Sequence, residues 1–210
     1  MTALSPTALP LLAVAAPTAS TAQTLFLALN IAWGACEVYL SLRRRAAGGA
    51  SRDGGTLGML WRVLVLSIAA AVWLAASGHG HLPAAWVEPA RWAGSVLIAG
   101  GLALRLWAVH VLARFFTVDV NLQRDHQLVQ RGPYRWVRHP SYTGALMAFL
   151  GLGVGVANPF SLLLLFVPVA WAFGQRIRIE EAALREAFPE TYPAYAARTG
   201  RLLPSLSRFR

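Results

Sequence analysis

The sequence predicts an all-α integral membrane protein with five transmembrane helices, the last two forming a short hairpin followed by a cytoplasmic C-terminal helical tail. Of the 210 residues, 56% are hydrophobic and only 13% are charged, which is too apolar for a soluble domain of this length. Five segments approach the roughly 20 apolar residues that a spanning helix requires. Because the sequence shows neither β-type alternation nor a fixed-period repeat, we expect these segments to be helical.

The candidate spans lie between turn residues and runs of arginine. They cover residues 22–42, 57–77, 91–113, 141–157 and 159–175. Asn158 and Pro159 form a turn dipeptide between the last two spans, which predicts a tight hairpin, and Pro168 predicts a kink in the fifth. The helix should then leave the bilayer and end near Pro189, before a tyrosine-containing amphipathic piece.

The distribution of arginine predicts the orientation. The net charge of +10 arises from 19 basic residues, all of them arginine. They gather in the linker after the first span, between the third and fourth spans, and in the tail, whereas the loop 78–90 has none. The positive-inside rule therefore places the N-terminus outside and the C-terminus in the cytoplasm of what we expect to be a bacterial inner membrane.

Several function classes do not fit this composition. Nucleic-acid binding would need a basic face on a soluble fold, whereas these arginines lie between apolar runs. The single cysteine, Cys36, excludes a disulfide-forming redox centre and a cysteine-based zinc cluster. His79 and His81 lack a third metal ligand nearby, so we expect no metal.

The stretch RGPYRWVRHPSYTG, residues 131–144, places polar residues at the start of the fourth span. Pro140 suits the first turn of a helix, which makes His139 its N-terminal edge. Free backbone N–H groups and the positive end of the helix dipole then favour an anion such as a carboxylate, with hydroxyl contacts from Ser141 and Tyr142. The neighbouring residues are interpreted as interfacial anchors: Arg131, Arg135, Trp136 and Arg138.

A second polar cluster, RIRIEEAALREAF, follows the fifth span. Glu181 and Arg185 have the favourable acid-before-base order and predict a structural pair, whereas Arg176 and Glu180 have the poorer order and are expected to address other groups. Adjacent carboxylates at a membrane boundary indicate a functional site, and a cationic ligand would compensate them. Elsewhere, the glycines of residues 151–157 predict close helix packing, and Arg105 is a candidate partner for Glu37.

The combination of GPYRWVRHPSYTG, a short apolar hairpin, RIRIEE and FPETYPAYAARTGRLLP resembles the isoprenylcysteine carboxyl methyltransferase family and its relatives among the phospholipid N-methyltransferases. The resemblance covers roughly residues 105–204. It divides the chain into N-terminal transmembrane helices, 1–104, and a catalytic methyltransferase region, 105–210. It implies an S-adenosyl-L-methionine-dependent enzyme that O-methylates the carboxyl group of an isoprenylcysteine-like substrate.

The resemblance also implies the site residues. Arg176 and Glu180 would be catalytic, and Arg176 would receive the substrate carboxylate. The cofactor would be bound by Gln123, His126, Gln127, Leu128, Val129, Tyr134, His139, Pro140, Ser141, Tyr142, Glu180 and Glu181. A lipophilic or prenylated substrate would enter from the bilayer and the cofactor from water, so the site must lie at the interface.

Two alternatives remain open from the sequence. A phospholipid or small lipophilic amine could be the acceptor in place of a carboxylate, in which case the amine must lose a proton and a glutamate could assist. A membrane transporter or structural bundle would also carry intramembrane charges and a broken helix.

Overall fold

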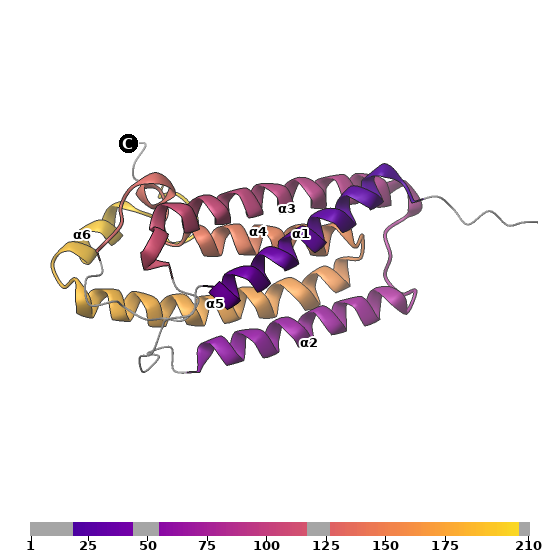
Figure 1. The fold of residues 1–210 in the computed structure, drawn as a ribbon. Coiled ribbons are helices and arrows are strands. Elements are labelled where there is room, and N and C mark those ends of the chain that lie inside the picture. Colours follow the sequence, from indigo (N-terminus) through magenta and orange to yellow (C-terminus); the bar gives the residue numbers. More distant parts are fainter. Residues whose placement is uncertain (1–18, 44–54, 117–126, 206–210) are drawn as a thin grey trace, which may run out of the picture.

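A computed structural model describes residues 19–43, 55–116 and 127–205. Apart from one isolated β-bridge, the regular structure of these residues is helical, as the sequence predicts. The elements are α1 (Thr21–Arg43), α2 (Thr56–Ala76), α3 (Ala84–Leu112), η1 (Ala113–Phe115), η2 (Gly132–Arg135), α4 (Pro140–Gly155), α5 (Pro159–Ala187) and α6 (Thr191–Arg198). Figure 1 shows helices α1 to α5 packed lengthwise in a bundle, with α6 at one end of it.

Four of these helices, α1, α2, α3 and α5, are long and apolar enough to cross a membrane. The fourth predicted span corresponds to α4, whose 16 residues fall just short of the roughly 17 that a perpendicular span requires. Helix α3 begins at Ala84 rather than at residue 91, and Pro89 lies within its early turns. Helix α5 continues beyond the predicted fifth span to Ala187, close to the predicted stop near Pro189.

The helices pack in a definite order. Helix α3 packs along α4, and α2 packs along α5. The two pairs meet where α4 contacts α5, and α1 packs against α3. The centre of the bundle is filled by aromatic and aliphatic side chains, among them Trp33 and Phe149, whose rings meet edge to face with centroids 4.5 Å apart. Many large apolar side chains instead face outward, including Ile31, Leu66 and Trp73. An apolar outer surface of this kind suits a lipid environment.

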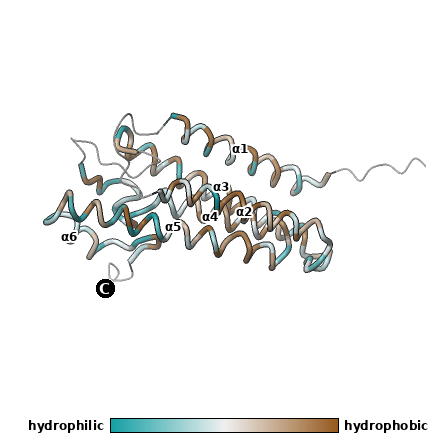
Figure 2. Tube along the Cα trace, turned by 90° about the horizontal axis from the view of Figure 1, so that it is seen from below, coloured by the Kyte–Doolittle hydropathy of each residue, from teal (hydrophilic) through white to brown (hydrophobic). Residues whose placement is uncertain are grey.

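Hydropathy changes along the bundle. Figure 2 shows hydrophobic residues along the helices and hydrophilic residues gathered at the end that carries α6. At the opposite end, the Asn158 side chain caps α5 by accepting hydrogen bonds from the backbone of Phe160 and Ser161, each at 3.1 Å. Its amide also donates to the carbonyl of His79 at 2.8 Å. These bonds join the loop that contains His79 to the turn between α4 and α5. The hydrophilic residues gather instead at the opposite end of the bundle.

Glycines set the spacing between α3 and α4. A Cβ added to Gly101 would lie 2.9 Å from the backbone nitrogen of Ala148, and one added to Gly144 would lie 2.8 Å from that of Arg105. Gly151 meets the backbone of Ile98 in the same way, also at 2.9 Å. The predicted close packing of the glycines in residues 151–157 is therefore confirmed at Gly151, and together with Gly144 it keeps α4 close to α3 along much of its length.

Substituting Gly101 by alanine should push α3 and α4 apart and lower the unfolding temperature of the purified protein in detergent. Gly100→Ala is the matched control, because its added methyl group would meet only the Met147 side chain at 3.6 Å. Alanine in a helix interior is otherwise favoured over glycine by roughly 0.5–1 kcal/mol, so the control should be neutral or slightly stabilising. Equal unfolding temperatures for the two variants would contradict the packing argument.

Candidate functional site

A cavity of about 450 Å³ extends from the polar end of the bundle into its apolar interior. This volume lies within the range of small-molecule sites. Ser141, in the first turn of α4, and Leu152, near its last turn, both line it. With a rise of 1.5 Å per residue, the cavity runs about 16 Å along that helix.

The two ends of the cavity differ in chemistry. Charged and hydroxyl-bearing side chains line the polar end, among them Tyr134, His139, Tyr142, Arg176, Glu180, Tyr192 and Tyr195. Deeper in the bundle, the lining residues are apolar and come from α2, α4 and α1, among them Leu60, Leu64, Ile68, Phe149, Leu152 and Trp33. The cavity is therefore amphipathic along its length.

The start of α4 is built by backbone pairing with the C-terminal segment. Helix α4 begins at Pro140 with His139 as its N-cap residue, as the sequence predicts. The backbone N–H of Arg138 donates to the carbonyl of Gly200 at 2.8 Å, and that of His139 donates to Arg201 at 3.1 Å. The Thr143 hydroxyl donates to the carbonyl of Leu202 at 2.7 Å. The chain therefore returns from α6 to fix the turn that enters α4.

Glu181, on α5, is the electrostatic centre of this region. Its side chain is only 2% exposed and accepts from Arg138 at 3.0 Å and from Arg201 at 2.7 Å. Its carboxylate also lies 3.3 Å from Nε2 of His139. A buried carboxylate is tolerated only where such partners compensate its lost hydration. The hydrogen bond to Glu181 in turn raises the pKa of the Arg201 guanidinium.

These contacts correct one interpretation and refine another. Arg138 is not an interfacial anchor, because its side chain is largely buried, pairs with Glu181 and donates to the carbonyl of Ala196 at 2.9 Å. The predicted pair of Glu181 with Arg185 exists, but at 3.9 Å it is the longest of the contacts to this carboxylate. Charge pairing over long sequence separations outweighs the local helical pair.

Arg176, Glu180, His139 and Tyr142 come together at the polar end of the cavity. Arg176 is 2% exposed, and its Nε donates to the Tyr142 hydroxyl at 3.3 Å. Nδ1 of His139 lies 3.8 Å from a carboxylate oxygen of Glu180. The rings of His139 and Tyr142 are nearly parallel, with centroids 5.7 Å apart. The structure thus juxtaposes the two polar clusters that the sequence separates by the hairpin.

A partly buried ion pair joins α1 to this site. Nη2 of Arg105 donates to Glu37 at 2.6 Å, so the pairing suggested by the sequence is confirmed. Nη1 of the same guanidinium donates to the Ser141 hydroxyl at 2.8 Å and to its carbonyl at 3.2 Å. Glu37, Arg105 and Ser141 all line the cavity. The bridge connects α1, α3 and the first turn of α4 through charge-assisted hydrogen bonds.

Two tyrosines hold the segment that precedes α4. The Tyr195 hydroxyl donates to the carbonyl of Tyr134 at 2.6 Å, and the Tyr134 hydroxyl donates to the carbonyl of Ala108 at 3.4 Å. Burial raises the pKa of the Tyr134 hydroxyl well above its usual value and that of Tyr195 to about 12. Both hydroxyls therefore stay protonated near neutral pH and act as donors.

The structure brings most of the candidate residues to the cavity. Those lining it are Leu128, Val129, Tyr134, His139, Ser141, Tyr142, Arg176 and Glu180. Gln127, Pro140 and Glu181 lie outside its lining, and Gln123 and His126 lie outside the described residues.

The site residues that sequence reasoning missed are Tyr192 and Tyr195 of α6, together with the apolar lining from α1 and α2. The spacing of three residues between Tyr192 and Tyr195 places both rings on one helical face, and this spacing was a usable signal. The apolar lining carried no comparable signal, because every spanning helix is rich in such residues.

The similarity to known proteins includes the part of the chain that forms α4 and α5. Residues 89–191 match the family model described as phospholipid methyltransferase. A protein-S-isoprenylcysteine O-methyltransferase of Saccharomyces cerevisiae is 37% identical over 114 residues, which are 53% of this chain and 47% of that protein. The cobalt-zinc-cadmium resistance protein CzcN of Cupriavidus metallidurans is 32% identical over 151 residues, 72% of this chain and 65% of that protein. The chain spans about half the length of the curated methyltransferases it matches.

A solved structure has a similar fold. The eukaryotic intramembrane Ras methyltransferase, an isoprenylcysteine carboxyl methyltransferase, superposes with a TM-score of 0.55 at 24% sequence identity. The similarity covers 69% of this chain and 52% of the other. Together with the four long apolar helices, this likeness makes the protein a multi-pass integral membrane protein.

Substituting Glu181 by glutamine should destabilise the polar end, because Arg138 and Arg201 would lose their shared counter-charge. Breaking one side of a buried ion pair costs on the order of 3 kcal/mol, so the unfolding temperature in detergent should fall clearly. Glu88→Gln is the control, since that carboxylate is 47% exposed and pairs with Arg91 at 3.2 Å at the opposite end. An unfolding temperature for Glu181→Gln equal to that of the control would contradict the central role of this carboxylate.

Proposed function

We propose, from the premise that the chain belongs to the isoprenylcysteine carboxyl methyltransferase family, that it is an integral-membrane S-adenosylmethionine-dependent methyltransferase. Its acceptor would be the carboxylate of an isoprenylcysteine-like lipophilic substrate. The amphipathic cavity carries this proposal, because its polar end suits a water-soluble methyl donor and its apolar end suits a lipid chain. Both substrates can then meet at one site.

The residues at the polar end fit the cofactor. Oε2 of Glu180 is buried and accepts no hydrogen bond from the part of the chain that the structure describes. A buried carboxylate oxygen of this kind suits a cationic ligand, and S-adenosylmethionine carries both an ammonium group and a sulfonium. The cofactor's own carboxylate suits the N-terminal turn of α4, beside His139 and Ser141. When bound, the cofactor supplies an electrophilic methyl group on a positively charged sulfur.

Some of the remaining candidate residues would contact the cofactor directly, and the others would support those that do. Leu128, Val129, Tyr134 and Tyr142 would contact the cofactor from the cavity wall. Gln127 and Pro140 would support that wall from outside the lining. Glu181 would act by holding His139, whose Nε2 it contacts at 3.3 Å.

Arg176 would bind the acceptor carboxylate. A guanidinium group can hold a carboxylate with two parallel hydrogen bonds, and Tyr142 fixes the orientation of this one by accepting from Nε at 3.3 Å. The acceptor is already ionised at neutral pH, since carboxyl groups have pKa values of about 4, and it needs no general base. The side chains would therefore promote the reaction by orienting the acceptor and excluding water from it.

The apolar part of the cavity would receive the prenyl chain. Val38 on α1 and Val65 on α2 line the cavity, yet they are 55% and 61% exposed. The cavity therefore reaches the outer surface between these two helices, which would face lipid in a membrane. A prenyl chain could enter there without crossing water, while the cofactor would enter at the end that carries α6 (Figure 1).

The separate entry routes of the prenyl chain and the cofactor suggest how the protein lies in the membrane. We propose five spans, with α4 and α5 as the final hairpin and the polar end on the cytoplasmic side of a bacterial inner membrane. The N-terminus would then lie outside and the C-terminal tail inside, which agrees with the positive-inside rule. Residues 105–210 would carry the catalytic machinery, and residues 1–104 would form the lipid-facing helices and part of the cavity wall.

A second acceptor class is an amine-bearing lipid. The match to the phospholipid methyltransferase model favours it, as do the two carboxylates, Glu37 and Glu180, on the cavity wall. An amine acceptor would have to lose a proton, and a carboxylate could receive it. The role of Arg176 distinguishes the two classes, because a guanidinium group attracts a carboxylate and repels a protonated amine.

Purified protein with methyl-labelled S-adenosylmethionine should label a prenylcysteine analogue that has a free carboxylate. Arg176→Ala should lower kcat/KM for that acceptor by about 100-fold or more while the calorimetric Kd for S-adenosylhomocysteine stays unchanged. Glu180→Gln should instead weaken binding of S-adenosylmethionine by about tenfold or more.

Arg178→Ala is the control for these variants, because Arg178 is exposed and lies on the same helix outside the cavity. Full turnover in Arg176→Ala would point to an amine or uncharged acceptor. Failure of the wild-type protein to bind S-adenosylmethionine, in detergent and in lipid, would overturn the methyltransferase proposal.

A bulky residue in the apolar part of the cavity should exclude the prenyl chain without affecting the cofactor. Leu64→Trp should raise the KM of a farnesylated acceptor by about fivefold or more, because overfilling a packed apolar space is unfavourable. Leu66→Trp is the control, since Leu66 is 69% exposed on the same helix and lies outside the lining. An unchanged KM in Leu64→Trp would place the prenyl chain elsewhere.

A further inference from the structure

Tyr192 has a buried hydroxyl that the fold itself does not use. The side chain is 1% exposed and lines the polar end of the cavity. Its hydroxyl forms no hydrogen bond with any residue that the structure describes. Buried polar groups are nearly always hydrogen-bonded in native proteins, so an exception beside a cavity indicates a place where a ligand completes the bond.

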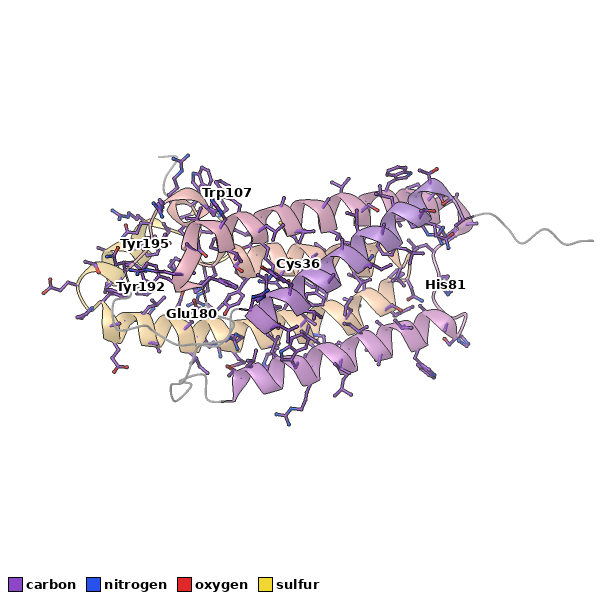
Figure 3. All side chains as sticks on the ribbon, in the orientation of Figure 1. Cys36, His81, Trp107, Glu180, Tyr192 and Tyr195 are labelled. Atoms are coloured by element: carbon purple, nitrogen blue, oxygen red, sulfur yellow. The ribbon has the colours of Figure 1, made fainter. Side chains whose placement is uncertain are left out.

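The neighbouring tyrosine provides the contrast. Tyr195 lies one turn further along α6, and its hydroxyl is satisfied by the carbonyl of Tyr134 at 2.6 Å. The rings of Tyr192 and Tyr195 meet edge to face with centroids 6.1 Å apart. Figure 3 shows both side chains at the end of the bundle that holds Glu180. One hydroxyl therefore supports the fold, while the other remains available to a ligand.

The Tyr192 hydroxyl can act only as a neutral group. Burial raises its pKa well above the usual value, and the nearby carboxylate of Glu181 raises it further. It therefore keeps its proton near neutral pH and can donate to an acceptor atom.

The position of Tyr192 is fixed from both sides. Its backbone N–H donates to the carbonyl of Phe188 at 3.0 Å, at the turn that follows α5. Arg138 holds the other end of α6 by donating to the carbonyl of Ala196 at 2.9 Å. A hydroxyl held in this way is preorganised, and a ligand need not order it on binding.

We propose that Tyr192 is a further cofactor-binding residue, whose hydroxyl donates a hydrogen bond to the nucleoside part of the cofactor. This inference rests on the function proposed above. Glu180 and the first turn of α4 suit the charged amino-acid part of the cofactor. The space beside the rings of Tyr134, Tyr192 and Tyr195 suits a flat, uncharged adenine base. The ring nitrogens of the base and the oxygens of its ribose could accept the hydrogen bond.

Tyr192→Phe removes only the hydroxyl and tests the proposal directly. The calorimetric Kd for S-adenosylhomocysteine should rise about three- to tenfold, the usual range for one lost hydrogen bond. The unfolding temperature without ligand should stay the same or rise, because the variant removes a buried polar group that has no partner.

Tyr195→Phe is the matched control. Its hydroxyl supports the backbone of Tyr134, so this variant should lower the unfolding temperature and change the Kd less than Tyr192→Phe does. A lowered unfolding temperature for Tyr192→Phe, with no change in Kd, would give that hydroxyl a structural role and overturn the proposal.

Fragments of the cofactor locate the contact. In competition with labelled S-adenosylmethionine, Tyr192→Phe should weaken inhibition by adenosine and leave inhibition by methionine unchanged. The reverse pattern would overturn the assignment to the nucleoside. If the wild-type protein binds S-adenosylhomocysteine and Tyr192→Phe binds it equally well, this inference alone fails; if the wild-type protein does not bind it, the proposed function fails as well.

Discussion

The polar end of the molecule depends on the buried carboxylate of Glu181. It pairs with Arg138, just before α4, and with Arg201, in the segment after α6. It also contacts His139, the N-cap residue of α4. A buried carboxylate without partners is strongly destabilising, and so are guanidinium groups that have lost theirs. The three segments therefore reach low free energy only when they assemble together. The position of His139 at the cavity follows from this assembly.

The adjacent residue, Glu180, faces a different environment. Successive residues in an α-helix point about 100° apart, so one carboxylate of the pair can hold the scaffold while the other lines the cavity. A second ion pair, between Arg105 and Glu37, performs a similar scaffold role for α1 and fixes Ser141. Charges that would be unfavourable in lipid thus either join helices or line the cavity.

Local signals allowed much of this arrangement to be predicted from the sequence. Pro140 marked the start of α4, and Asn158 with Pro159 marked the turn that brings Arg176 back beside Tyr142. The role of Arg138 could not be predicted, because its partners lie 43 or more residues away along the chain. The spacing of Tyr192 and Tyr195 could indicate a shared helical face, but not that this face lines the cavity, because that depends on how the segment after α5 folds back. Pairing over such separations leaves no pattern in the neighbouring residues.

The short length of α4 is what creates a recessed polar site. Helix α4 ends and α5 begins at the turn of residues 156–158, but α4 has 16 residues and α5 has 29. At 1.5 Å per residue, these lengths are about 24 Å and about 43 Å. Measured from the shared turn, α5 therefore extends well beyond the first turn of α4. Arg176 lies 17 residues into α5, which is about 26 Å from the turn and level with that first turn. His139, at the start of α4, and Arg176 therefore lie at the same level of the bundle, where both side chains are buried and electrostatic interactions are stronger than in water.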